Sequence, residues 1–136
     1  MSPYLIYFPS AGDKEIGFIT IAELERILPF RVERIFWTHN TPAHVIRGKH
    51  AHKETEQVLV ALKGKITVQT ETVGGETATF VLDNPNVGLY LPPWLWHTLR
   101  YSRNAVQMVM ASTPFNENDY FRNKADFIEY WSQHQP

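Results

Sequence analysis

Short apolar or alternating segments, each followed by turn-forming residues, recur along most of the chain. The segments are 4–8, 16–21, 32–38, 56–62, 65–70, 78–82, 87–91 and 105–112. Alternation of apolar and polar residues over four to eight positions is typical of β-strands with one buried face, and Gly, Pro, Asn and Asp between such segments mark turns. Eight short strands with close turns predict an all-β barrel or sandwich.

Three local patterns add detail to this all-β prediction. Gly74-Gly75 predicts a hairpin with a type I′ turn, because both central residues of that turn need positive φ. The segment 22–28 has helical spacing of apolar residues and stops before Pro29, which predicts about two helical turns. Aromatic residues mixed with charges at the end of the chain predict a C-terminal helix over about 116–133.

Length and composition limit the classes of protein to be considered. With 136 residues, the chain has the size of one domain, which we expect to span 1–136. A net charge of -1 and the absence of cysteine exclude a broadly basic nucleic-acid binder, a disulfide and any thiolate site. No run of about 18 apolar residues and no leader peptide are present, so we expect a cytoplasmic protein with neither a nucleic-acid nor a membrane partner.

Histidines carry the strongest chemical signal. Four of the six lie between positions 39 and 52, and His50 and His52 project from the same face if their segment is extended, because side chains alternate along a strand. Glu56 or Gln57 follows at the start of the next apolar segment. His97 comes later, after a strand that runs into Pro92-Pro93.

The order of these residues resembles the two cupin motifs, His-x-His-x(3,4)-Glu-x(6)-Gly and Gly-x(5)-Pro-x-Gly-x-x-His. The glycine that ends the first motif corresponds to Gly64. Trp94 stands where the second motif has its internal glycine. The resemblance implies a double-stranded β-helix, or jelly roll, with the motif histidines lining its interior. Many cupins use such a set for iron, manganese or zinc, which here is His50, His52, Glu56 and His97.

A narrower resemblance covers about 29–130. The segments RGKHAHKETEQVLVALKG, LDNPNVGLYLPPWLWH, VMAS and FNENDYFRNKADFIEY resemble the WxcM-like family of sugar 3,4-ketoisomerases. That resemblance implies a dTDP-linked substrate, dTDP-4-keto-6-deoxyglucose, in deoxysugar biosynthesis. It also implies catalysis without a metal or other cofactor, and a homodimer with swapped N-terminal strands.

Moving a carbonyl from C4 to C3 requires a base that removes the C3 proton and a group that returns a proton at C4. Imidazole titrates near neutral pH and suits both steps. By resemblance, His50 is the base and His52 is the relay. Arg47 is the expected partner of the pyrophosphate, since guanidinium matches phosphate oxygens; His97 and Tyr90 are the expected contacts to the sugar or base.

Two positions depart from the family pattern. Ile16 stands where members tend to carry arginine or tyrosine, and Phe36 lies where members tend to carry a tyrosine. Both changes remove a polar contact, so a non-catalytic nucleotide-sugar-binding cupin remains an alternative, as does the metal-dependent cupin. His97 matches the histidine of members that form the 3-keto-6-deoxygalactose product, which favours that stereochemistry at C4.

Overall fold

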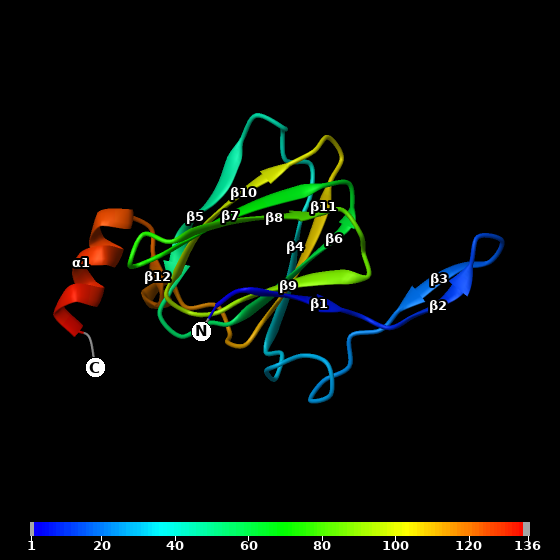
Figure 1. The fold of residues 1–136 in the computed structure, drawn as a ribbon, viewed down its shortest axis with the longest axis horizontal. Helices are drawn as coiled ribbons and strands as arrows, with labels where there is room; N and C mark the ends of the chain where they lie inside the picture. The colour runs from blue at the N-terminus through cyan, green and yellow to red at the C-terminus, as the bar shows by residue number, and fades with distance from the viewer. Residues whose placement is uncertain (1, 135–136) are drawn as a thin grey trace.

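The computed structural model describes residues 2–134, and Figure 1 shows a β-barrel with a projecting hairpin at one end and a helix at the other. The elements, in chain order, are β1 (Tyr4–Tyr7), β2 (Ser10–Asp13), β3 (Gly17–Thr20), β4 (Arg34–Thr38), β5 (Ile46–His52), β6 (Gln57–Lys63), β7 (Ile66–Thr72), β8 (Thr77–Leu82), β9 (Val87–Leu91), β10 (Leu95–Tyr101), β11 (Val106–Ala111), the 3₁₀ turn η1 (Glu117–Asp119), β12 (Tyr120–Phe121) and α1 (Lys124–His134). Within this described part of the chain, no helix has the length and hydrophobicity that spanning a membrane requires.

Two five-stranded antiparallel sheets face each other and form the barrel. Their strand orders are β1-β9-β6-β11-β4 and β12-β5-β10-β7-β8. Alternate residues of both sheets point inward and pack into a core that includes Leu59 and Val109 from one sheet and Val68 and Leu99 from the other. This arrangement confirms the predicted all-β jelly roll. Strand β4 lies at the edge of the first sheet and β5 lies next to the short edge strand β12 of the second, and both β4 and β5 contribute residues to the interior pocket.

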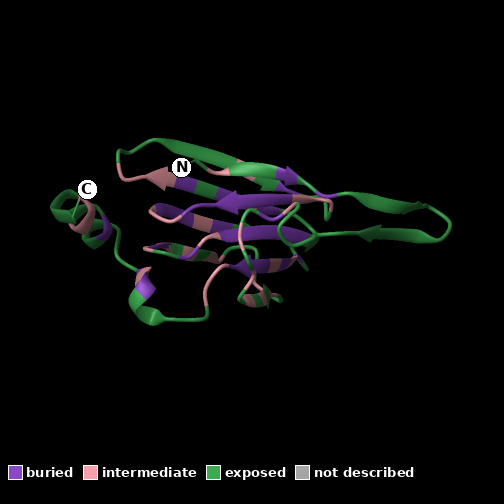
Figure 2. Cartoon of the chain, turned by 90° about the horizontal axis from the view of Figure 1, so that it is seen from below, coloured by how far each residue is buried: buried purple, intermediate pink, exposed green. Residues whose placement is uncertain are grey.

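The first sheet carries a second apolar layer on its outer face. Ile6, Val58, Tyr90 and Met110 are buried there under the N-terminal segment and the loop that contains Leu28. The hairpin of β2 and β3 extends away from the barrel, and Figure 2 shows it exposed along its whole length.

Three expectations about local structure need correction. The segment 22–28 forms turns instead of a helix, because Glu25 has a φ of 66° and Pro29 stops any continuation. Gly74-Gly75 does join the hairpin of β7 and β8, but only Gly75 has positive φ, so the turn is not type I′. The sequence pattern also does not predict β10 as a separate strand.

The C-terminal helix begins at Lys124, eight residues later than expected. The residues before it form the 3₁₀ turn and the short strand β12, which pairs with β5 so that Tyr120 lies opposite His52. Asn123 accepts the backbone N–H of Asp126 and so caps the helix. The correction matters for function, since it brings the segment before the helix to the histidines.

Candidate active site

Three imidazole rings meet inside the barrel because β5 and β10 are paired neighbours. The register places His97 opposite His50, and a bulge follows at the next position of β10. The ring centroids of His50 and His97 lie 4.6 Å apart, and those of His50 and His52 lie 5.0 Å apart. The three histidine rings therefore lie close together, as the sequence predicts.

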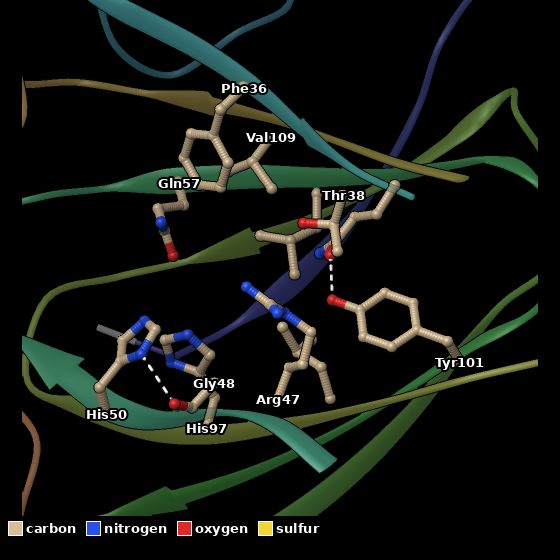
Figure 3. Close-up of a pocket in the computed structure, with 12 residues that line it drawn as sticks. Phe36, Thr38, Arg47, Gly48, His50, Gln57, His97, Tyr101 and Val109 are labelled. Atoms are coloured by element: carbon tan, nitrogen blue, oxygen red, sulfur yellow. Dashed lines mark hydrogen bonds between the residues drawn. The ribbon is translucent and has the colours of Figure 1, made fainter. Parts of the chain in front are cut away.

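A pocket with a cavity volume of about 80 Å³ opens beside these rings (Figure 3). His50 and His97 lie at one end, and Arg47, Thr38 and Tyr101 lie at the other. The remaining walls combine one glycine, apolar side chains and two glutamines: Phe36, Gly48, Gln57, Leu59, Leu99, Gln107 and Val109. Such a volume holds several water molecules or part of one sugar ring, so any larger ligand has to extend out of the pocket.

His50 and His97 are each held in one tautomer by a backbone carbonyl. The Nδ1 atom of His50 lies 3.0 Å from the Gly48 oxygen, and that of His97 lies 3.2 Å from the Leu95 oxygen. A carbonyl only accepts, so Nδ1 carries the proton and Nε2 keeps its lone pair. Burial, reinforced by the neighbouring imidazoles, lowers the pKa of His50 to about 4 and that of His97 well below its usual value. Both rings are neutral at pH 7.

His52 is held differently, by a buried carboxylate. Its Nδ1 lies 2.9 Å from Oδ2 of Asp119, which is 8% exposed. The same carboxylate accepts the Thr55 hydroxyl and, at 2.7 Å, the backbone N–H of Glu54. Burial alone would raise the pKa of Asp119, but these hydrogen bonds outweigh it and hold the pKa at about 2. Asp119 is thus an anion that fixes the His52 tautomer and leaves its Nε2 available for chemistry.

Tyr120 covers the same pair of histidines. Its ring centroid lies 4.3 Å from that of His52 and 5.1 Å from that of His50. The guanidinium of Arg122 lies over the Tyr120 ring and is held on its other side by the Glu117 carboxylate. This segment therefore covers one side of the site before the chain enters α1.

The structure brings some of the predicted site residues together and separates others. Arg47 lines the pocket, whereas Tyr90 lies on the outer face of its sheet, stacked on Tyr4. Glu56 also points outward, because its carboxylate accepts the Tyr90 hydroxyl at 2.6 Å. Gln57 enters the pocket instead.

These positions bear on the metal alternative. The four-residue set His50, His52, Glu56 and His97 is not assembled, since Glu56 is turned away from the imidazoles. Among residues 2–134, no group of three or more histidine, cysteine, aspartate or glutamate side chains has an arrangement that could hold a metal ion. The donor set expected for a metal-dependent cupin therefore does not fit this pocket.

Trp94 occupies the glycine position of the second cupin motif and has a strained backbone conformation there. Its φ is 62°, a conformation that residues with a Cβ rarely adopt. The backbone N–H of Trp94 donates to the His52 carbonyl at 2.8 Å. The Trp94 ring packs on Phe121, Phe127 and Trp131. These contacts hold Trp94 in place and connect the start of β10 to strand β5.

Buried polar atoms without a hydrogen-bond partner cluster around the barrel interior. Within the described residues they are Nε and Nη2 of Arg34, Nε2 of His52 and Nε2 of Gln107. The sequence pattern singles out neither Gln107 nor Asp119. Asp119 lies in a segment that resembles the family, but the apolar spacing of that segment favours a helix. The inward position of Gln107 within 105–112, by contrast, follows from strand alternation.

Comparisons with known proteins find a matching family model and a similar sequence. The family model described as FdtA: WxcM-like, C-terminal matches residues 1–132. A TDP-4-oxo-6-deoxy-alpha-D-glucose-3,4-oxoisomerase from Aneurinibacillus thermoaerophilus is 37% identical over 131 residues, which cover 96% of this chain and 93% of the relative.

Two solved structures have similar folds. QdtA, a sugar 3,4-ketoisomerase from Thermoanaerobacterium thermosaccharolyticum crystallised with TDP, gives a TM-score of 0.91 at 30% identity and covers 98% of this chain and 97% of its own. A 3,4-ketoisomerase from Helicobacter canadensis gives a TM-score of 0.91 at 31% identity, with 97% and 98% covered.

Proposed function

Because the chain belongs to the WxcM-like family, we propose that it is a sugar-nucleotide 3,4-ketoisomerase that acts on a TDP-4-keto-6-deoxyhexose. The observation that carries the proposal is the meeting of three imidazoles, of which His50 and His97 line the pocket and His52 is held by the buried Asp119 carboxylate. QdtA has been crystallised with TDP and, as a mutant, with TDP-4-keto-6-deoxyglucose, which supports the same class of ligand here.

His50 is the base in this proposal. Its Nε2 lone pair is free because Nδ1 donates to the Gly48 carbonyl, and its lowered pKa keeps the ring unprotonated at neutral pH. Removal of the C3 proton by His50 gives an enolate whose charge lies on O4, and transfer of that proton from the imidazole to O4 gives the enediol.

His52 then removes the O3 proton of the enediol and returns a proton at C4. The Asp119 carboxylate accepts the hydrogen bond from Nδ1 of His52 and orients the ring, just as a carboxylate does for the histidine of a catalytic triad. His50 and His52 therefore have different partners, a neutral carbonyl and an anion, and this difference supports their assignment to different proton-transfer steps.

The nucleotide remains largely outside the pocket in this proposal, because the cavity has room for no more than part of one sugar ring. Arg47 reaches the pocket from β5 and is our proposed partner for the diphosphate. Tyr90 is not a substrate contact in this proposal, because its ring is enclosed in the outer apolar layer, away from the pocket.

A homodimer is the proposed assembly. β1 pairs with β9 of its own chain, so the candidate for exchange is the hairpin of β2 and β3, whose strands pair only with each other. Phe18 and Ile19 on this hairpin are 64% and 69% exposed, and Trp37 on the edge strand β4 is 64% exposed. Large apolar side chains at these positions are typical of a surface that a second copy covers.

Proton NMR in deuterated water tests the enzymatic proposal. With dTDP-4-keto-6-deoxyglucose, we expect exchange of the C3 proton and the appearance of a 3-keto product whose C4 configuration can be read from its couplings. Exchange without product would indicate a working base with a different natural sugar. Binding of dTDP without exchange would contradict isomerase activity.

A nucleotide-sugar-binding protein without catalysis is the second candidate. The observation that favours it is Phe36, which lines the pocket and offers no hydroxyl, while Ile16 is 82% exposed on the hairpin turn and has no polar group to contribute. The same NMR measurement separates the two candidates, since a binding protein exchanges no C3 proton.

A further inference from the structure

The end of the pocket opposite His50 contains a hydrogen-bond donor that the isomerase chemistry described above does not use. Gln107 on β11 is 1% exposed and lines the pocket, yet its Nε2 has no hydrogen-bond partner. A buried amide N–H without an acceptor costs about 1–3 kcal/mol, so such a group is retained most readily where a ligand or an ordered water satisfies it.

The orientation of the Gln107 amide is fixed by Tyr101. The Tyr101 hydroxyl donates to Oε1 of Gln107 and so links the two sheets across the barrel. Burial raises the pKa of Tyr101 to about 12, against the opposing charge of Arg47, so the phenol keeps its proton at neutral pH. With Oε1 occupied as an acceptor, Nε2 is presented as a donor only.

Gln107 lies where it can contact a sugar whose C3 and C4 atoms are next to the histidines. Gln107 and Val109 point to the same side of β11 and line the same pocket, and two residues along a strand span about 7 Å. Gln107 thus lies one row of side chains beyond Val109, opposite Thr38 of the neighbouring strand. A ligand that extends from His50 to the opposite end of the pocket meets this amide.

We propose that the Gln107 side-chain N–H donates a hydrogen bond to an oxygen of the bound hexose at the end of the pocket opposite His50. The proposal rests on the proposed function, because it assumes that the pocket takes the sugar of a nucleotide sugar. It makes Gln107 a specificity-determining residue: a hexose with an oxygen at that position satisfies the amide, and a sugar without one leaves the amide unpaired.

The test compares the affinities of TDP and of TDP-6-deoxyglucose, an unreactive sugar nucleotide, for the wild-type chain and for Gln107→Met. Calorimetry should show that the variant loses about 10- to 100-fold in affinity for TDP-6-deoxyglucose, the effect of removing a buried hydrogen bond. Its affinity for TDP should stay within about 2-fold of wild type. Gln69→Leu, which removes an exposed glutamine from the outer face of β7, is the matched control and should change neither affinity.

Loss of stability is separated from loss of recognition by a double variant. Gln107→Met leaves the Tyr101 hydroxyl without its acceptor, whereas Tyr101→Phe combined with Gln107→Met removes both polar partners and should restore the melting temperature. The double variant should still lack the affinity contributed by the sugar. Recovery of that affinity together with stability would overturn the proposal.

Two further outcomes separate this inference from the function on which it rests. If Gln107→Met keeps the wild-type ratio of the two affinities, the amide contacts only water and the inference is wrong, while the isomerase proposal stands. If the wild-type chain binds neither TDP nor TDP-6-deoxyglucose, the proposed function fails and the inference fails with it.

Discussion

Replacing Asp119 by asparagine tests the link between the carboxylate and His52. The substitution keeps the shape of the side chain but removes the negative charge that accepts hydrogen bonds from His52, from Thr55 and from the Glu54 backbone. An asparagine can offer only one acceptor oxygen, and its NH₂ group faces donors on the other side. We therefore expect Asp119→Asn to lose both stability and turnover.

The magnitude follows from the pKa of Asp119, which is about 2 in the folded chain against an ordinary value of 3.8. That difference corresponds to about 2 kcal/mol of unfolding free energy. Because folding lowers the pKa, the unfolded chain binds more protons between these two values. The contribution is therefore complete above about pH 5 and disappears as the pH falls through about 2.

Urea unfolding at pH 7 and at acidic pH measures this contribution. Asp119→Asn should be about 2 kcal/mol less stable than wild type at pH 7, and the difference should shrink toward pH 2. Asp126→Asn, the same change at an exposed position on α1, is the control and should cost less than about 1 kcal/mol. An Asp119→Asn chain with wild-type stability at pH 7 would refute the reasoning.

Three further predictions concern the site and its supports. His50→Asn should abolish C3 proton exchange measured by NMR but leave dTDP affinity nearly unchanged, and equal loss of both would mean that His50 only binds or supports the fold. The acidic limb of kcat/KM should lie near pH 4, where His50 protonates, and a limb near pH 6.5 would contradict the lowered pKa. Trp94→Gly should relieve about 1 kcal/mol of backbone strain but lose about 3–5 kcal/mol of aromatic packing, so urea unfolding should show a net loss.

Residues whose positions follow from strand alternation are predictable from the sequence. His50 and His52 are two positions apart on one strand, and both turn toward the same space. The same rule explains why Tyr90 points outward: its neighbours Leu89 and Leu91 fill the barrel core. Alternation along β9, applied to the sequence alone, is therefore sufficient to exclude Tyr90 from the pocket.

Residues whose positions depend on contacts between distant segments are not predictable in this way. Asp119 reaches His52 only because Tyr120-Phe121 adds a strand to β5, and the apolar spacing of 116–133 favours a helix over that pairing. The choice between Glu56 and Gln57 as the inward residue likewise depends on where strand β6 begins, and the Glu56 bond to Tyr90 decides it.

The pairing of β12 with β5 also has a consequence for how the protein is made. Strands β1 to β11 end at Ala111, and β12 with the residues that orient His52 and cover the site follows after them. A ribosome makes these residues later, so a nascent chain that stops before residue 119 contains strands β1 to β11 and the three histidines but not the carboxylate. In such a chain His52 lacks the partner that orients its ring.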